Sequence, residues 1–222
     1  MPRVRNSAPG VTPRAPDAAA VSLLARGATE AEKFRHYAAI VAANGGKVNP
    51  AGLATVLGVR GLNADGARHA TRATRAYDDF IVVLTSDGHV NEFSGATHPG
   101  NAWSPKARDV DGDTKGDVGT IRPGNFLAEP HGPQFGGPSF SLRTADGNPR
   151  LPGWRDTDQD GRVSERERTA SVRRADSLTE VLFHPDSAFS VGCQTLAPND
   201  WERFVEAVGG PAAHFTYTLV DG

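Results

Sequence analysis

The chain has very little cysteine: Cys193 is the single one in 222 residues, so no internal disulfide can form. It has no run of eighteen apolar residues, which argues against a transmembrane helix. It has no excess of either charge. The formal net charge is −2 and the basic residues form no stripe, so we expect no nucleic-acid partner. Gly-rich phosphate loops and a Gly-x-Ser-x-Gly elbow are absent too. The composition of the whole chain, 38% hydrophobic and 23% charged, is typical of a folded globular protein.

The N-terminal third consists of two segments of different composition. Residues 1–16 contain four prolines and few side chains to bury, so we predict a flexible arm. This arm has basic residues but no apolar core, so no secretory signal is expected. Residues 17–76 are predicted to be a helical region. Thr29 and Glu32 fit a capping box, and Gly45-Gly46 stops the first helix. A second short helix is expected over residues 49–58.

Residues 77–222 are predicted to form a β-rich domain. The stretch 78–97 contains a Ser-Asp-Gly turn between two β-branched runs, which predicts a hairpin. Short strands are expected near 117–121, 124–128 and 140–143, and a buried strand over 177–184 would end at His184. A helix over 198–210 and a final strand over 214–222 complete the pattern. Helices first and strands afterwards predict an α+β fold with a β-rich core.

Cys193 lies in the segment FHPDSAFSVGCQTL, residues 183–196. A lone cysteine is more often an inert apolar side chain than a nucleophile. His184 is close enough in sequence to be brought beside the sulfur by one turn, and an imidazole can take the proton of a thiol. Backbone amides at Gly192 and Cys193 could stabilise an oxyanion. The residues alone leave the inert and the catalytic interpretations about equal.

The string from His184 to Ser190-Val191-Gly192-Cys193 resembles the His…Ser-x-Gly-Cys signature of the L,D-transpeptidase (YkuD-type) catalytic domain. The resemblance covers about residues 78–208 and implies an L,D-transpeptidase-like core with an N-terminal helical extension. It also implies that Cys193 attacks a peptidoglycan stem peptide, with His184 as the base. Ser190 would orient the histidine or shape the pocket, and Gly192 would contribute to the oxyanion hole. An amine of another stem, or water, would then resolve the thioester.

The sequence departs from that family at two points. The interval from His184 to Cys193 is shorter than usual, so a small loop should cover the site. The family's arginine after the cysteine is replaced by Gln194, followed by threonine and leucine. Arg143 or Arg155 are candidates to replace it, and the alternative is that Gln194 donates a hydrogen bond to the peptide. His131, in a turn-rich loop, is a further candidate for substrate binding, although most such histidines are ordinary loop residues.

Two acidic segments predict calcium. Residues 156–167, DTDQDGRVSERE, match the EF-hand loop, and Gly161 allows its sharp turn. The expected ligands are Asp156, Asp158, Asp160, the Arg162 carbonyl, Ser164 and Glu167. No incoming helix is recognisable, so we expect an isolated structural site. Residues 109–117 resemble a shorter loop with Asp109, Asp111, Asp113 and Asp117 as ligands, and the alternative is a polar connector. Calcium is plentiful outside cells, which favours extracytoplasmic action in the periplasm or cell wall.

The leading hypothesis is a cysteine enzyme that cross-links, exchanges or hydrolyses peptidoglycan stem peptides. One alternative is a peptidoglycan amidase or endopeptidase delivered as an antibacterial effector or phage product. An alternative of another class is a calcium-stabilised cell-wall-binding module with an inert Cys193. The acceptor, the route of export and the oligomeric state stay open.

Overall fold

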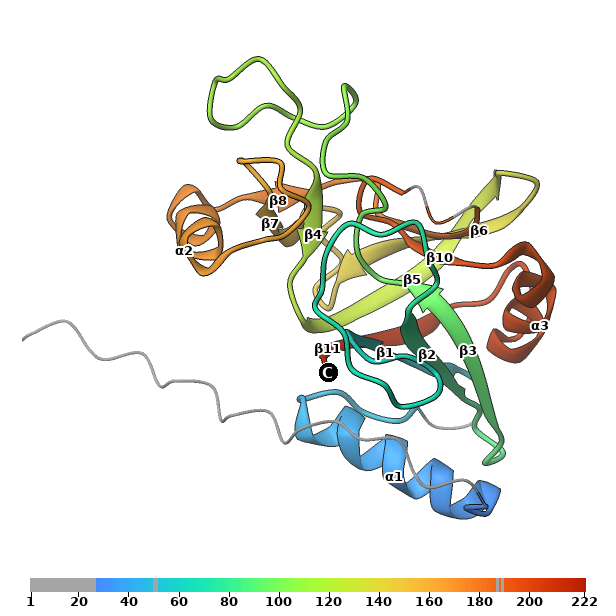
Figure 1. The fold of residues 1–222 in the computed structure, drawn as a ribbon. Helices are drawn as coiled ribbons and strands as arrows, with labels where there is room; N and C mark the ends of the chain where they lie inside the picture. Colours follow the sequence, from blue (N-terminus) through green and yellow to red (C-terminus); the bar gives the residue numbers. More distant parts are fainter. Residues whose placement is uncertain (1–26, 50–51, 187, 189) are drawn as a thin grey trace, which may run out of the picture.

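The structure is a computed structural model that describes residues 27–49, 52–186, 188 and 190–222. The predicted arm over residues 1–16 lies outside the described residues. Eight strands close into a barrel, in the order β1-β11-β5-β6-β9-β10-β3-β2 (Figure 1). Their bounds are Ala54–Arg60 (β1), Asp79–Leu84 (β2), Val90–Ala96 (β3), Gly124–Gln134 (β5), Gly137–Thr144 (β6), Leu182–Pro185 (β9), Gln194–Leu196 (β10) and Phe215–Asp221 (β11). Pairing is parallel between β1 and β11 and between β9 and β10, and antiparallel elsewhere around the barrel.

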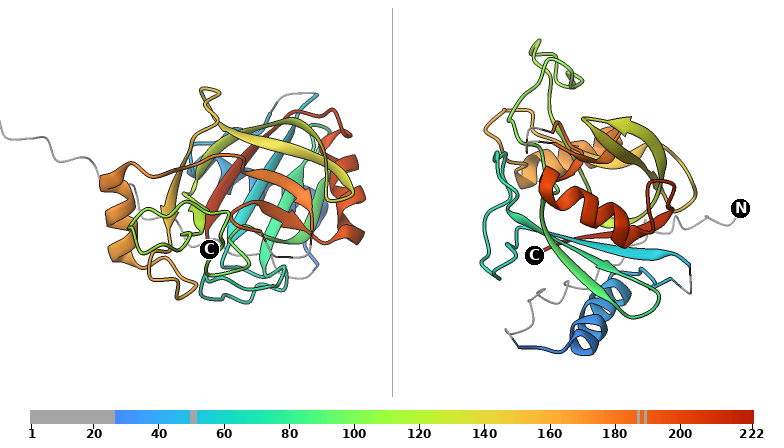
Figure 2. Two further views of the ribbon diagram at one scale, coloured as in Figure 1. Left: turned by 90° about the horizontal axis from the view of Figure 1, so that it is seen from above. Right: turned by 90° about the vertical axis from the view of Figure 1, so that its right-hand side faces the viewer.

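A separate three-stranded sheet stands beside the barrel. It consists of β4 (Gly119–Ile121), β7 (Leu151–Arg155) and β8 (Ser177–Leu178), in the order β4-β7-β8. Helix α2 (Glu165–Arg174) packs near this sheet, at the opposite end of the molecule from α3 (Pro198–Val208) (Figure 2). The expected α+β class with a β-rich core is therefore confirmed, and the hairpin predicted over residues 78–97 is present as β2 and β3.

Two of the expected elements differ from the structure. The helix predicted over residues 49–58 is not present, because Ala54–Arg60 forms strand β1 between β2 and β11. The helical region expected over residues 17–76 therefore contributes a strand to the same barrel as the residues after 77. The single strand predicted over 177–184 is divided into β8 and β9, which belong to different sheets. Glu180, between them, has a φ of 57°, a left-handed conformation that no strand contains.

Every residue of strands β1 and β2 is buried, because both faces of these strands are covered. Val56 and Ile81 point into the barrel, where α3 supplies Trp201 and Phe204 to the same apolar cluster. Their neighbours along the strands pack outward, in a second cluster that contains Leu57, Val59, Phe80 and Val82. Helix α1 covers that outer cluster.

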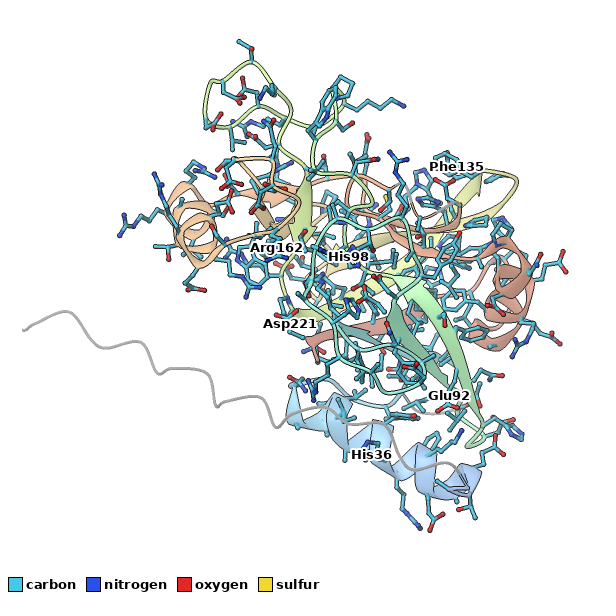
Figure 3. All side chains as sticks on the ribbon, in the orientation of Figure 1. His36, Glu92, His98, Phe135, Arg162 and Asp221 are labelled. Carbon is cyan, nitrogen blue, oxygen red and sulfur yellow. The ribbon has the colours of Figure 1, made fainter. Side chains whose placement is uncertain are left out.

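Helix α1 (Glu30–Ala43) begins at the predicted capping box: the Thr29 hydroxyl accepts from the Glu32 amide, and the Glu32 carboxylate accepts from the Thr29 amide. Tyr37 and Val41 are its buried side chains. The Tyr37 hydroxyl donates to Glu92 Oε1 on β3 at 2.6 Å, beside α1 (Figure 3). Lys33 pairs with the other oxygen of Glu92. No helix among the described residues is both long and apolar enough to cross a membrane.

We expect Tyr37→Ala to lower the free energy of unfolding by about 3–5 kcal/mol, because it removes a ring packed between α1 and Phe80. Tyr37→Phe should cost only about 1–2 kcal/mol, the contribution of its hydrogen bond to a carboxylate. Arg35→Ala, an exposed change on the same helix, is the control and should stay within about 0.5 kcal/mol. Urea unfolding measures all three. An equal cost for the alanine and phenylalanine variants would show that the ring does not anchor the helix.

Candidate functional site

A pocket of about 680 Å³ contains four residues that the sequence singled out: Cys193, His184, Ser190 and His131. Its walls come from the segment after β3, the tip of the β5–β6 hairpin, strand β9 and the loop before β10. The other lining residues are Asn101, Ser104, Pro105, Lys106, Gln134, Phe135, Glu180, Leu182, Asp186 and Val191.

The parallel pairing of β9 with β10 brings the cysteine and the histidine to this pocket. Gln194 pairs with Phe183 and Thr195 with His184. Cys193, directly before β10, therefore lies level with Leu182, whose amide donates to Cys193 Sγ at 3.4 Å. Leu182 and His184 are two residues apart, so they share a face of β9, about 6.6 Å from one to the next. Both line the pocket.

The thiol of Cys193 is neutral at rest. Burial raises its pKa to about 11, and the nearby Asp186 and Glu180 carboxylates add to the effect. Sγ contacts the Glu180 carbonyl oxygen at 3.7 Å, as a weak donor. No hydrogen bond joins Cys193 and His184 among the contacts of the described residues, so the resting arrangement is not a thiolate–imidazolium pair.

His184 is also neutral at rest. It is only 3% exposed, and burial lowers its pKa, against the opposing effect of the Pro185 carbonyl and Asp186. Nδ1 lies 3.2 Å from the Pro185 carbonyl oxygen and so carries the proton, which leaves the lone pair on Nε2. Phe135 stacks on the imidazole at a centroid distance of 4.5 Å. The stacking fixes the plane of the ring.

Phe135 is a residue that the sequence analysis missed. It lies at the tip of the β5–β6 hairpin (Figure 3), in a two-residue turn in which Phe135 and Gly136 have φ values of 51° and 88°. A bulky side chain rarely adopts positive φ, so this conformation is strained. The ring is 64% exposed despite its apolar character. A strained, exposed aromatic ring over the histidine is well placed to contact a ligand.

The turn before Cys193 depends on Ser190 and Gly192. The Ser190 hydroxyl donates to the Cys193 carbonyl at 2.9 Å and accepts from the Gly192 amide at 3.4 Å. Ser190 therefore shapes the turn, and no hydrogen bond joins it to His184 among the described residues. Gly192 has a φ of 136°, and a Cβ there would lie 2.5 Å from the Gly119 carbonyl oxygen. Only glycine fits this position without a shift of backbone.

Three expected substrate contacts do not fit the structure. Gln194 is fully buried: its Nε2 donates to the Gly192 carbonyl and its Oε1 accepts from Tyr217, so it supports the turn. Arg143 pairs with Glu129 and is not part of the pocket lining. Arg155 is buried and donates to the carbonyls of Asp117 and Ser177. The cation that does line the pocket is Lys106, which lies far from the cysteine in sequence and carries no local signal.

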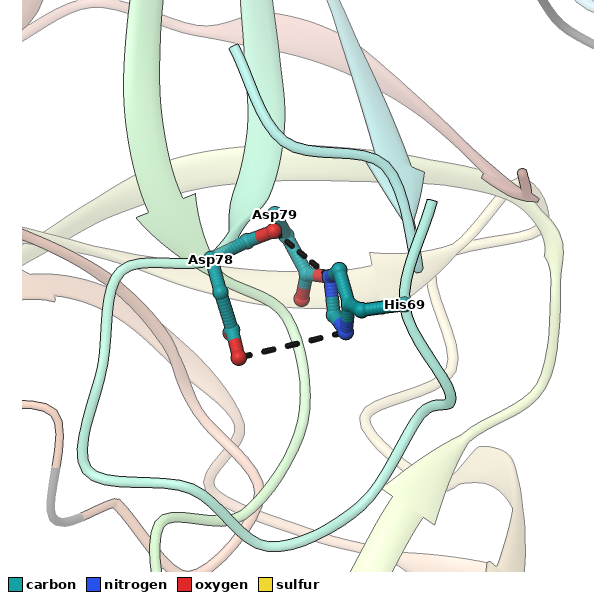
Figure 4. A group of neighbouring side chains, drawn as sticks. All are labelled: His69, Asp78 and Asp79. Atoms are coloured by element: carbon teal, nitrogen blue, oxygen red, sulfur yellow. Dashed lines mark hydrogen bonds and ion pairs between the residues drawn. The ribbon is translucent and has the colours of Figure 1, made fainter. Parts of the chain in front are cut away.

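A charge cluster consists of His69, Asp78, Asp79 and His98 (Figure 4 draws the first three). Asp79 and His98 are buried, and the other two are half-buried. His98 Nε2 lies 3.0 Å from Asp78 Oδ1 and Nδ1 lies 3.1 Å from the Pro99 carbonyl, so both nitrogens face acceptors. Burial opposes the charge on His98, but its contacts with Asp78 and Asp79 raise its pKa. Asp79 likewise raises the pKa of His69 to about 9. We infer two imidazolium–carboxylate pairs.

This cluster anchors the loops that form the pocket. Asp79 accepts from the amide of Gly61 and from the amide and hydroxyl of Thr97, all at 2.7 Å. Two residues beyond His98, the Gly100 amide donates to the Ser190 carbonyl at 2.8 Å. The arrangement is therefore structural, although ligand atoms of His69, Asp78 and Asp79 also lie within 4.8 Å of one another.

The two acidic loops each bring three carboxylates together. Ligand atoms of Asp156, Asp158 and Glu167 lie within 4.8 Å of one another, and so do those of Asp109, Asp111 and Asp117. The other expected carboxylate ligands, Asp160 and Asp113, lie outside these groups. The Ser164 hydroxyl caps α2: it accepts from the Glu167 amide and donates to the Glu167 carboxylate. The Arg162 amide donates to Asp160. Burial, aided by nearby Glu167, raises the pKa of Asp156 to about 7.

Comparisons with known proteins add little. No family model and no curated protein matches the chain. Two crystal structures of the helical cell shape determining protein Pgp2 from Campylobacter jejuni are similar in structure. The first has a TM-score of 0.37 at 13% identity and covers 76% of this chain and 48% of Pgp2. The second, a K307A mutant, has a TM-score of 0.36 at 12% identity and covers 89% and 57%. The chain thus spans about half the length of these neighbours.

We expect Gly192→Ala to destabilise the protein by at least about 2 kcal/mol, because it combines a disfavoured φ with a clash against Gly119. Gly147→Ala is the matched control: its φ is 84° and a Cβ there meets nothing within 4 Å, so it should cost only the conformational part. Urea unfolding of both variants measures the difference. Equal costs would show that the contact with Gly119 is not tight.

We expect alkylation of Cys193 by iodoacetamide to be slow at pH 7 and to rise about tenfold per pH unit up to pH 10. Only the thiolate reacts, and burial raises the pKa of this thiol to about 11. Intact-mass spectrometry counts the adduct without ambiguity because the chain has one cysteine. N-acetylcysteine is the reference thiol. A rate that is already on a plateau at pH 7 would instead indicate a resting thiolate stabilised by His184.

Proposed function

We propose that the protein is a cysteine-dependent acyltransferase or hydrolase that acts on peptidoglycan stem peptides, with an L,D-transpeptidase-like active site. The observation that carries the proposal is the convergence of Cys193 and His184, from two adjacent parallel strands, on one pocket of about 680 Å³. The His…Ser-x-Gly-Cys resemblance supplies the substrate class. Such a substrate places the working site in the periplasm or cell wall.

The reaction begins from the neutral pair. The thiol turns from the Glu180 carbonyl towards His184, and Nε2 takes its proton as sulfur attacks the substrate carbonyl carbon. The Pro185 carbonyl, which faces Nδ1, and the nearby Asp186 charge stabilise the imidazolium. The histidine returns the proton to the leaving amine as the carbon–nitrogen bond breaks, which leaves a thioester on Cys193. An amine or water then attacks the thioester and regenerates the thiol.

The lining of the pocket suits a peptide with carboxylates and aliphatic stems. Lys106 is the one lysine or arginine among the residues described as lining it, and it takes the role of the missing family arginine. Phe135 and Leu182 offer apolar surface on the side of His184. Glu180 and Asp186 face the same space and suit the amino group of an acceptor.

A cell-wall-binding module with an inert cysteine is the second candidate. The neutral thiol, held between the Leu182 amide and the Glu180 carbonyl, favours it. An amidase or endopeptidase would use the same pair on a different bond of peptidoglycan. The products of one incubation separate these possibilities.

The full chain is incubated with tetrapeptide fragments of peptidoglycan, and intact-mass spectrometry follows the protein while chromatography follows the products. We expect a transient acyl adduct on Cys193 and none on Cys193→Ala. His184→Ala should slow the appearance of products by about 10²–10⁴-fold, because it removes the base. His214→Ala, a change of an exposed histidine outside the pocket, is the control. Lys106→Ala should raise KM more than it lowers kcat, and the exposed Arg173→Ala should change neither.

Products formed equally by the wild type and Cys193→Ala, with no adduct, would refute the cysteine mechanism. If neither the wild type nor Cys193→Ala forms products and both co-sediment equally with purified walls, the protein is the binding module. Release of the whole stem peptide would identify an amidase, whereas loss of the terminal residue or a new cross-link would identify carboxypeptidase or transpeptidase activity.

A further inference from the structure

The sheet beside the barrel brings the two acidic loops together. Strands β4 and β7 are antiparallel, with Gly119 opposite Arg155. The loop that enters β4 therefore meets the loop that leaves β7 at the same edge, and the Asp156 amide donates to the Val118 carbonyl at 3.2 Å. Further out, Gln159 Nε2 donates to Asp113 Oδ2 at 3.2 Å. Figure 1 shows the loop before β4 rising beyond the sheet, near α2 and the loop that precedes it.

Each loop contains one buried carboxylate oxygen that has no hydrogen-bond partner among the described residues. These are Asp117 Oδ1 and Asp156 Oδ1, on side chains that are 0% and 2% exposed. The second oxygen of each is satisfied by a loop amide, Val110 for Asp117 and Gly161 for Asp156. A buried carboxylate oxygen without a donor is costly. Asp117 and Asp156 each belong to a group of three acidic residues whose ligand atoms lie within 4.8 Å of one another. A cation at each group removes both costs.

The donors are carboxylate oxygens, and the longer loop follows the EF-hand spacing with Gly161, at a φ of 84°, at its sharp turn. Hard oxygen ligands in an irregular, flexible arrangement suit Ca²⁺ better than Mg²⁺, which requires near-octahedral geometry. Of the nearby positive charges, Lys115 pairs with Asp113 at 3.8 Å, and Arg155 donates from Nη1 to the Asp117 carbonyl. Arg155 lies beneath the loops and does not reach either unpartnered oxygen.

The loop over residues 109–117 continues directly into one wall of the pocket. Ser104 and Lys106 line the pocket, and their segment folds back against the acidic loop. The Ser104 amide donates to the Gly116 carbonyl at 3.2 Å, and the Asp117 amide donates to the Arg108 carbonyl at 3.1 Å. A Cβ on Gly116 would lie 2.0 Å from the Ser104 carbonyl oxygen, so the two limbs are in close contact. Whatever fixes residues 109–117 therefore fixes this wall.

We propose that the two acidic loops bind a pair of calcium ions, one held by Asp156, Asp158 and Glu167 and one by Asp109, Asp111 and Asp117, and that the second ion orders the wall of the Cys193 pocket formed by residues 101–108. The two metal sites are independent of the proposed function. The ordering of residues 101–108 is likewise independent of it.

The binding test uses the chelator-treated full chain and calcium chloride in isothermal titration calorimetry. We expect two ions per chain for the wild type and one for each of Asp117→Asn and Asp156→Asn. Asp65→Asn, an exposed change in another loop, is the control and should retain two. Calcium at about a hundred times the Kd of both sites should raise the unfolding midpoint of the wild type by roughly 10–20 °C. Magnesium should compete poorly.

Asp117 is buried, so its variant could fail to fold, and Asp111→Asn is the exposed second variant of the same site. Terbium luminescence resolves the two ions. Tryptophan sensitises bound terbium. Trp103 pairs with Asp117 in an isolated β-bridge, and Trp154 precedes Asp156 by two residues. Trp103→Phe and Trp154→Phe should therefore each remove the sensitised emission of one of the two ions. Two ions retained by both Asp111→Asn and Asp117→Asn would overturn the site at residues 109–117. No calcium heat and no shift of the midpoint in the wild type would overturn both sites.

The wall is tested without any use of enzymatic activity. Hydrogen exchange should show that calcium protects the amides of residues 101–108 at least tenfold in the wild type and in Asp156→Asn, but not in Asp111→Asn. Protection that is the same with and without calcium, in a protein that binds two ions, would overturn the ordering of the wall. Failure of the proposed function would leave these outcomes unchanged, because they depend on metal and backbone alone.

Discussion

The candidate site depends on one strand pairing, the parallel pairing of β9 with β10. The two strands are short, four and three residues, and only eight residues of sequence, 186–193, separate them. Their register sets Cys193 level with Leu182 and puts His184 two residues further along the same face. A shift of one residue would turn His184 away from the pocket, because side chains alternate between the faces of a strand. The register is stabilised on both sides, by β6 against β9 and by β3 against β10.

The loops of the pocket are stabilised by different interactions. The turn before Cys193 relies on Ser190, on Gln194 and on the close approach of Gly192 to Gly119. The segment after β3 is anchored by the two imidazolium–carboxylate pairs, from which Gly100 reaches the Ser190 carbonyl. Buried charges of this kind stabilise only when all partners are present, since removal of one leaves its counter-charge unpaired. The pocket is therefore sensitive to residues that do not line it.

The sequence allowed the local elements to be predicted and left the long-range ones unpredicted. The capping box of Thr29 and the Ser-Asp-Gly turn act over a few residues and were sufficient to place α1 and the β2–β3 hairpin. The helix predicted over residues 49–58 is wrong because β1 is buried on both faces, so its apolar run lacks the alternation that marks a half-exposed strand. His184 and Cys193 were found because they are neighbours in sequence. Phe135 and Lys106 reach the pocket only through the barrel topology, which no local pattern encodes.

The neutral resting pair sets a limit on any mechanism at this site. Moving the proton from the Cys193 thiol, whose pKa burial raises to about 11, to the His184 imidazole, whose pKa burial lowers, is uphill in free energy. This free-energy cost adds to the barrier of any step that uses the pair. Proton transfer concerted with attack on the carbonyl reduces it, because the charge then moves onto an oxyanion that backbone amides can stabilise. The raised pKa of Cys193 thus lowers the reactivity of the sulfur towards small electrophiles, and the proposed reaction would depend on a bound peptide. The exposed Phe135 ring over His184 and the proposed metal-ordered wall would both act by closing the pocket around such a peptide.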